Sequence, residues 1–507
     1  MTANGPATGA RERRARLLVQ AALAAIVLAT LVHTRADPDL WGHVAFGRDI
    51  VATRSVPSAD PYSFTSDVRW VNHEWLAEVA MFGAWAALGG PGLIALKVLA
   101  IALALGLAQI ALRRQGVTSP ARDLLLAVAA VASIEQANAV RPQIFSILLF
   151  AALLATMVRV ERGRLAAIAW VPVILLAWVN LHGGWIVGAG TLALWATTRL
   201  LQAPGSREAR AVCAVSAASA AATLINPYGW DMWGFLLTTV RPQRLEISDW
   251  QPVYHMGPGV YLTWGALVAI AALALWRSTA RPPLARVLVV IALAAGAFHV
   301  NRLLMFLAFA IVILLGPQVQ QALGRRRKES RGPAGAVATA AAAATAVVLL
   351  AGALGTTAVY GRCVIVESAR WPEPGAAGFI AERARTGRML TWFDWGEYAI
   401  WHLAPGIKVS MDGRRETVYS PRVLTDHLSF YYDGRSARAF LDALQADYIW
   451  LPASLPVVSR LETGREVEVL WRGPKSVLFS TRPIGAGATR PATAEDPPRL
   501  SRCFPGP

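Results

Sequence analysis

Residues 92–112 read GLIALKVLAIALALGLAQIAL, an apolar run in which Lys97 carries the only charge. A helix needs about 20 such residues to cross the hydrocarbon core of a bilayer. Runs of similar character lie at 17–32, 165–179, 184–198, 259–276 and 335–354. Because soluble domains rarely contain so many long apolar runs, the sequence predicts an α-helical polytopic membrane protein.

The composition of the 507 residues agrees with a membrane protein and excludes nucleic-acid binding as the function. Charged residues make up 16% of the chain, whereas soluble domains have about 25%. The net charge is +17, but the basic residues stand in short clusters between apolar runs, where they orient spans. We therefore expect the lipid bilayer, and no nucleic acid, as a partner. The preference for arginine over lysine, with much alanine, is typical of a GC-rich bacterial genome.

About eleven spans are predicted, near 17–33, 92–112, 122–136, 143–158, 165–180, 184–201, 210–225, 259–276, 286–299, 303–317 and 335–355. Arg11, Arg13, Arg14 and Arg16 precede the first span, so the N-terminus should be cytoplasmic. Alternation from there places the other basic clusters on the same inner side. Residues 356–507 are then extracytoplasmic, and the predicted location is the inner (plasma) membrane of a bacterium.

Three domains follow from where the apolar runs stop. Residues 1–355 form the transmembrane domain, which includes a long first outer loop at 34–91 with helical spacing at 40–53 and 74–88. Residues 356–484 alternate short helical and strand-like stretches, which predicts a small extracytoplasmic α/β domain. Residues 485–507 read as a disordered tail. Whether Cys363 and Cys503, which flank this region, form a disulfide stays open.

The first outer loop carries the leading catalytic candidates, Asp37 and Asp39, at the exit of the first span. A carboxylate there can accept a proton from an acceptor group or hold a divalent metal such as Mg²⁺ or Mn²⁺. The alternative is a proline-containing turn in which Asp39 caps the following helix.

Polar residues at the outward ends of later spans are the second group of candidates. Arg141 and Arg302 can clamp a phosphate, because a guanidinium offers paired donors to two oxygens; the alternative is that they reach toward lipid head groups. Two strand ends of the C-terminal domain add Asp394, Asp412 and Arg414 as candidates. The alternative is that Asp394 and Asp412 cap helices and that Arg414 pairs with one of them. The remaining candidates of the outer face are His43, Asn72, His73, Glu74, Glu135, Gln143, Asn180, His182, His299 and Asn301.

Motifs at both ends of the chain resemble a family of bacterial polytopic proteins grouped with the GT-C glycosyltransferases. The first is Asp37-Pro-Asp39-Leu-Trp-Gly-His43, followed by Asn72-His-Glu-Trp75; the distal one is Trp395-Gly-Glu-Tyr398 with Asp412-Gly-Arg414. The resemblance implies a polyprenyl- or dolichyl-phosphate sugar donor, as in related mannosyltransferases. It also implies an essential acidic residue in the first outer loop, at Asp37 or Asp39.

The leading functional hypothesis is a membrane glycosyltransferase that moves a sugar from a polyprenyl-phosphate donor to an extracytoplasmic glycan, lipid or protein. Two alternatives stay open. A lipid-linked-glycan transporter or flippase would carry charged residues within its spans, and Lys97 is the nearest candidate. A non-catalytic scaffold of envelope assembly would use the C-terminal domain as its binding module and tolerate loss of Asp37 and Asp39.

Overall fold

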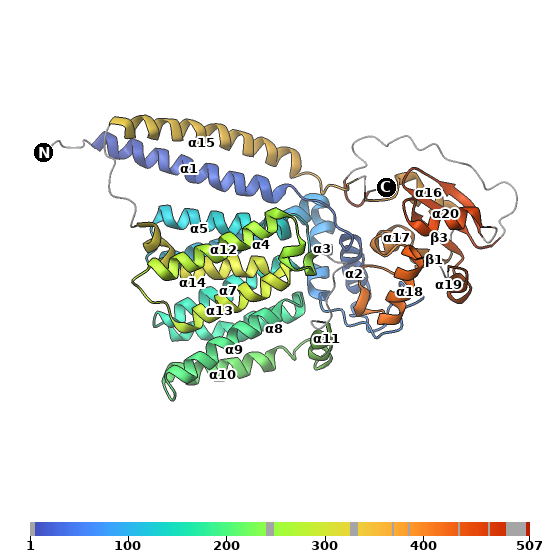
Figure 1. The fold of residues 1–507 in the computed structure, drawn as a ribbon, viewed down its shortest axis with the longest axis horizontal. Coiled ribbons are helices and arrows are strands. Elements are labelled where there is room, and N and C mark those ends of the chain that lie inside the picture. The colour runs from blue at the N-terminus through green and yellow to red at the C-terminus, as the bar shows by residue number, and fades with distance from the viewer. Residues whose placement is uncertain are drawn as a thin grey trace. The chain divides into compact units, whose positions relative to one another are not determined.

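The computed structural model describes residues 6–239, 248–324, 333–367, 370–383, 386–433, 437–464, 467–482 and 503–506 (Figure 1). The chain divides into two compact units. The helical unit comprises residues 1–34, 94–138 and 142–362, and the mixed unit comprises residues 35–93, 139–141 and 363–507. The first outer loop therefore groups with the C-terminal α/β elements, whereas the domain limits drawn from the sequence placed it with the spans.

A helix coincides with each of the predicted spans. These helices are α1 (Pro6–Val32), α4 (Gly90–Arg114), α5 (Ser119–Ala132), α7 (Gln143–Glu161), α8 (Trp170–Leu181), α9 (Trp185–Gln202), α10 (Arg207–Ala222), α12 (Pro258–Arg277), α13 (Leu284–His299), α14 (Leu304–Gly324) and α15 (Pro333–Tyr360). Among the described residues, six helices are long and apolar enough to cross a membrane. The chain is a multi-pass membrane protein, and the number of spans stays a prediction.

Helix α14 lies at the centre of the helical unit. Its residues from Leu304 to Gly316 are all buried, because α5, α7, α12 and α13 pack around it. At the other extreme, α1 and α15 lie side by side (Figure 1) and meet through Ala25, Ala29 and Ala353. Small side chains let two helix backbones approach closely in a membrane, where lipid removes the hydrophobic drive for association.

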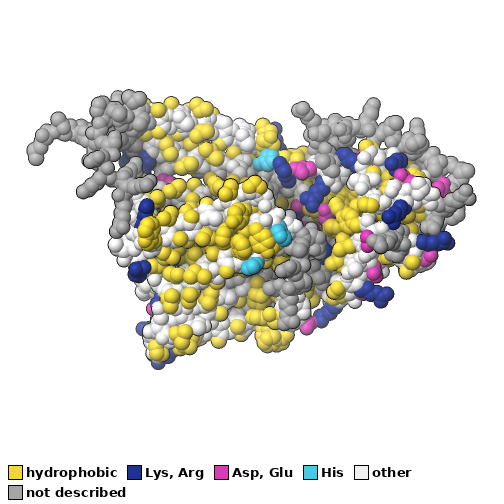
Figure 2. All heavy atoms as spheres, in the orientation of Figure 1, with side chains coloured by type: hydrophobic (Ala, Val, Ile, Leu, Met, Phe, Trp, Pro, Cys, Tyr) yellow, Lys and Arg dark blue, Asp and Glu magenta, His cyan; other side chains and the backbone are white. Residues whose placement is uncertain are grey.

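A buried ion-pair network joins several helices of this unit. Arg286 donates from Nε to Glu161 Oε2 at 2.6 Å and from a terminal nitrogen to Gln115 Oε1 at 2.7 Å. Arg199 lies 3.1 Å from the other oxygen of Glu161. A charge buried within a membrane protein is retained when it is paired in this way. On the face that Figure 2 shows, the surface of the helical unit is largely apolar, and its Lys and Arg side chains lie mainly along one edge.

The mixed unit is built on a five-stranded sheet in the order β2-β1-β3-β5-β4. The strands are β1 (Gly387–Thr391), β2 (Ile407–Val409), β3 (Tyr448–Pro452), β4 (Glu468–Arg472) and β5 (Ser476–Ser480). β1 runs parallel to β2 and β3, with Met389 opposite Val409 and Leu390 opposite Ile449, whereas β5 is antiparallel to β3 and β4. The predicted α/β domain is confirmed. Strand β5 was not predicted, because all five of its residues are buried and show no alternation.

Short helices surround this sheet and carry the first outer loop. They are α2 (Leu40–Thr53), α3 (Trp75–Leu88), α16 (Pro374–Arg383), α17 (Gly396–Leu403), α18 (Pro421–Tyr432), α19 (Ala437–Leu444) and α20 (Pro456–Thr463). Helix α18 begins as its sequence dictates, with Pro421 in the first turn and the Ser420 hydroxyl accepting from the Val423 N–H at 3.4 Å. Helix α2 packs on α3 and α17, so the first outer loop and the C-terminal domain meet within one unit.

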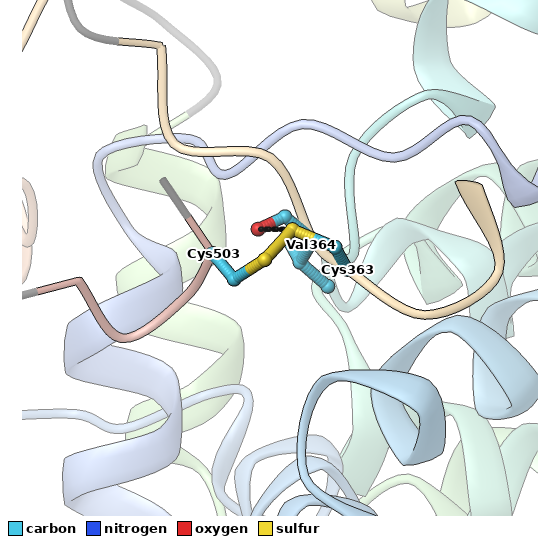
Figure 3. The surroundings of a disulfide bond; sticks show 3 residues. All are labelled: Cys363, Val364 and Cys503. Atoms are coloured by element: carbon cyan, nitrogen blue, oxygen red, sulfur yellow. Dashed lines mark hydrogen bonds between the residues drawn. A yellow bond between two sulfur atoms is a disulfide. The ribbon is translucent and has the colours of Figure 1, made fainter. Parts of the chain in front are cut away.

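A disulfide joins Cys363 to Cys503 across 140 residues of sequence (Figure 3). Beside it, Phe504 donates its N–H to the Val364 carbonyl at 2.9 Å, and Trp41 in α2 donates from Nε1 to the Pro505 carbonyl at 2.7 Å. Residues 503–506 are therefore held against α2. Most of the tail predicted to be disordered, 485–502, lies outside the described residues.

Candidate functional site

The site begins where the chain enters α2. Asp39 occupies the N-cap position of this helix, as the capping alternative expected. Its side chain, however, makes no capping hydrogen bond. The Asp39 side chain is 34% exposed, whereas Leu40 and Trp41 behind it are completely buried. The buried pair fixes the helix and leaves the Asp39 carboxylate at the surface of the unit.

Asp37 is buried and its Oδ2 accepts a hydrogen bond from Arg141 Nε. Arg141 reaches it because residue 139 pairs with Arg35 as a short parallel bridge, which draws residues 139–141 into the mixed unit. The Arg141 guanidinium also lies 3.9 Å from Asp39 Oδ2. The other oxygen of Asp37, Oδ1, is buried and has no hydrogen-bond partner within the described residues. Arg141 therefore compensates the charge of the first-loop carboxylates.

Glu397, in the first turn of α17, completes a cluster of carboxyl groups around Asp39. It is 3% exposed, and its Oε2 accepts the Gly42 N–H at 3.1 Å. A β-carbon on Gly413 would collide with Asp39 Oδ1 and lie 3.1 Å from Glu397 Oε1, so both carboxyl groups border this glycine. Burial, and then repulsion from Asp39 and Asp412, raise the pKa of Glu397 well above its usual value. Its surroundings therefore favour the neutral form of the Glu397 carboxyl group.

His43 faces the acidic residues of α3. Its ring nitrogens lie 3.5 Å from Glu78 Oε1 and 4.0 Å from Glu74 Oε2, and Asn72 donates to Glu78 at 2.6 Å. Burial lowers the pKa of His43, but its contact with Glu78 and the charges of Glu74, Glu78 and Asp39 outweigh burial and raise it to about 9. The neighbouring carboxylates therefore favour the imidazolium form of His43. His73 lies 3.6 Å from Glu74 at the edge of the same group.

Arg414 and Asp412 form a buried latch with Asp60 of the first outer loop. Arg414 donates from its terminal nitrogens to both Asp60 oxygens at 2.8 and 3.0 Å, and from Nε to Asp412 Oδ1 at 2.9 Å. Its guanidinium carbon also lies 4.6 Å from the centre of the Trp70 ring. These contacts fasten the loop to the sheet and agree with the structural interpretation of Arg414 and Asp412, with Asp60 as the partner that sequence reasoning missed.

The candidates of the helical unit occupy separate local networks. His182 Nδ1 accepts the Gly184 N–H at 3.0 Å and lies 2.7 Å from Ser146 Oγ, so the ring proton belongs on Nε2. The Asn180 amide donates to the Leu176 and Ile225 carbonyls at 2.9 and 3.0 Å.

Three further candidates of this unit, His299, Asn301 and Arg302, lie at or just after the end of α13. Arg302 lies 3.8 Å from Asp249 and 5.1 Å from the centre of the Trp250 ring. Asn301 is fully buried, and its side-chain amide lacks a hydrogen-bond partner in the described part of the chain. Gln143 is buried at the start of α7, and His299 ends α13. The side chain of Glu135 lies outside the described residues.

Asp394, at the end of β1, contacts Arg370 at 3.2 Å instead of joining the carboxyl cluster. Burial raises its pKa, while Arg370 opposes that shift.

The described residues contain no group of three or more His, Cys, Asp or Glu side chains placed to hold a metal ion.

No protein-family model matches the chain, and no curated protein matches its sequence. Solved structures do. ArnT from Cupriavidus metallidurans in the apo state is 15% identical with a TM-score of 0.55, covering 96% of this chain and 100% of that one. The ArnT structure bound to undecaprenyl phosphate is 14% identical with a TM-score of 0.54, covering 94% and 99%.

A third structure, the arabinofuranosyltransferase AftD from Mycobacteria in a mutant form, is 16% identical with a TM-score of 0.53. The match covers 93% of this chain and 42% of AftD, so the chain spans less than half the length of that protein. ArnT and AftD are both glycosyltransferases of the GT-C superfamily. At these identities the likeness establishes the fold.

Proposed function

We propose that this multi-pass membrane protein, which has the fold of the GT-C glycosyltransferases, transfers a sugar from a polyprenyl-phosphate donor to an acceptor hydroxyl. The observation that carries the proposal is the carboxyl cluster at the head of α2, where Asp39 is partly exposed beside buried Glu397 and the cation of Arg141. The donor class is supported by the undecaprenyl phosphate bound to ArnT, a protein of the same fold.

In the proposed reaction, Asp39 is the general base. The acceptor oxygen forms a bond to the anomeric carbon of the sugar while the bond from that carbon to the phosphate oxygen breaks. The acceptor proton passes to the Asp39 carboxylate, and the phosphate oxygen keeps the electron pair of the broken bond. Asp39 suits this role because it is more exposed than Asp37, whose carboxylate is engaged by Arg141.

Arg141 is proposed to assist the departing phosphate. Its guanidinium is the cation beside both first-loop carboxylates, and fixed positive charge stabilises the negative charge that develops on a leaving group. Arg302 belongs to the helical unit, and its role as a second phosphate ligand rests on its position at an outward span end.

The first test compares Asp39→Asn with the wild type in a deletion strain and in membranes supplied with polyprenyl-phosphate sugars. We expect Asp39→Asn to insert normally and to lose transfer by about 10²- to 10⁴-fold, the usual contribution of a general base. The matched control is Asp426→Asn, the same substitution at an exposed aspartate of α18 in the same unit.

Full transfer by Asp39→Asn would contradict the assignment of the base. If Asp37→Asn and the double variant also restored a wild-type envelope glycan profile, a transporter or a scaffold would replace the transferase. The transporter would then rest on Lys97, which is completely buried and donates to Thr34 Oγ1 at 2.7 Å.

A further inference from the structure

The sheet of the mixed unit has a topological switch point between β1 and β3. The chain passes from β1 to β2 on one side of β1, and then returns to β3 on the other side, which gives the order β2-β1-β3. The connections from the carboxyl ends of β1 and β3 therefore diverge. In open α/β sheets, ligands bind in the crevice that this divergence leaves.

A cavity of about 510 Å³ lies at this edge of the sheet. Trp392 and Trp395 line it directly after β1, and Ser454 lines it after β3. Lys475 lines it from the turn before β5, because β5 is antiparallel and begins at the same edge. The cavity thus occupies the position that the topology predicts, and its lining residues are distinct from the carboxyl cluster of Asp39.

The cavity is lined by aromatic rings and cations. Trp371 joins Trp392 and Trp395 in its wall, and Arg370 and Lys475 supply positive charge. Trp395 is held in place by donating from Nε1 to the Arg370 carbonyl at 2.9 Å. Arg370 is half exposed and contacts Asp394, whereas Lys475 has no carboxylate within 4.0 Å among the residues that the structure describes.

Two indole N–H groups in this wall lack acceptors. The Nε1 atoms of Trp371 and Trp392 are buried, and neither has a hydrogen-bond partner in the described ranges. Trp371 as a whole is 2% exposed. Both N–H groups are covered by protein, so this wall offers a ligand the carbon atoms of its rings and not these donors.

We propose that this cavity binds an anionic saccharide. The half-buried ring of Trp392 suits the C–H face of a sugar, and the exposed Ser454 hydroxyl suits its hydroxyl groups. The two cations, Arg370 and Lys475, suit a carboxylate or phosphate on the sugar. The site is separate from the proposed transfer reaction and does not depend on it.

The test measures calorimetric binding of glucuronic acid and glucose 1-phosphate to the purified full chain in nanodiscs, without any polyprenyl donor. Glucose and inorganic phosphate are the comparison ligands. We expect both anionic sugars to bind about tenfold tighter than either comparison ligand. Lys475→Ala should weaken that binding about fivefold or more, and Trp392→Ala should abolish it. The matched control is Lys408→Ala, at an exposed lysine of β2 that does not line this cavity.

If Trp392→Ala fails to fold, Ser454→Trp replaces it, because Ser454 is exposed and an indole there would fill the cavity. The proposal is overturned if no anionic sugar binds at millimolar concentration, or if Lys475→Ala and Ser454→Trp bind as the wild type does. Inorganic phosphate binding as tightly as glucose 1-phosphate would also overturn it, since the site would then recognise the ion alone. Loss of transfer in Asp39→Asn leaves every one of these outcomes unchanged.

Discussion

Glu397 is buried against Asp39 and Asp412, and its raised pKa has a consequence for stability. A carboxyl group whose pKa rises on folding stabilises the protein fully below its ordinary value of 4.5, and that contribution is lost as the pH rises through the folded pKa. Glu397→Gln keeps the acceptor for the Gly42 N–H and removes the ionisation. The thermal stability of the wild type should fall as the pH rises above 4.5, and that of the variant should not. At neutral pH we expect the variant to be at least as stable as the wild type.

Thermal unfolding of both proteins across a pH series checks this expectation. The control is Glu382→Gln, at an exposed glutamate of α16. A parallel decline in the wild type and Glu397→Gln would show that the proton is held elsewhere in the cluster.

His43 also contributes stability that is lost as the pH rises, but at a higher pH than Glu397 does. Its pKa rises from 6.5 to about 9, so the stability contributed by its charged form is complete below pH 6.5 and is lost as the pH rises through about 9. His43→Gln should flatten the stability profile between these values and lower stability at pH 6. An unchanged profile would mean that Glu74 and Glu78 do not interact with a charged ring, and NMR titration of the imidazole would measure its pKa directly.

Among the structural elements, the latch between the first outer loop and the sheet has the clearest energetic consequence. Arg414 is buried between Asp60 and Asp412, so Arg414→Ala leaves two buried carboxylates without their cation. Removing one partner of such a network costs about 3–5 kcal/mol. We expect a correspondingly large loss of stability in the mixed unit, measured by thermal unfolding and protease sensitivity.

Arg422→Ala is the matched control for the latch, because that side chain is 90% exposed and its pairing with Asp426 contributes little. A double-mutant cycle with Asp60→Asn separates the bond between loop and sheet from the local bond to Asp412. An Arg414→Ala variant as stable as Arg422→Ala would rule out the latch.

For the whole molecule, the disulfide tests both topology and stability. Disulfides persist in oxidising compartments, so an extracytoplasmic mixed unit should contain Cys363 and Cys503 oxidised in cells. After reduction, a membrane-impermeant maleimide should label these two thiols in intact cells. Labelling that requires permeabilised cells would contradict the predicted orientation, and Cys213→Ser removes the remaining thiol from the comparison.

The same bond should stabilise the mixed unit. It closes a loop of 140 residues, and removing a native disulfide typically costs about 2–5 kcal/mol. The Cys363→Ser/Cys503→Ser variant should therefore unfold at a lower temperature, and reducing agent should have no further effect on it.

Local patterns in the sequence determined the elements of this protein. Apolar runs predict where helices lie, because the bilayer sets their length, and the spacing of apolar residues at 40–53 and 74–88 predicts α2 and α3. The polar stretch around Asp37 and Asp39 marked the loop that carries the candidate site. Strand β5 was missed because a fully buried strand has no alternation to read.

The tertiary structure alone decided which of these residues meet. Glu397 borders Asp39, Arg141 donates to Asp37, and Arg414 donates to Asp60. More than a hundred residues of sequence separate the two members of each pair. Each is a contact between side chains that no helical or strand period relates, and the pKa of Glu397 follows from burial that exists only once the contacts have formed. Local patterns report local geometry, whereas the charge and hydrogen bonding of a site arise from the packing that brings distant segments together.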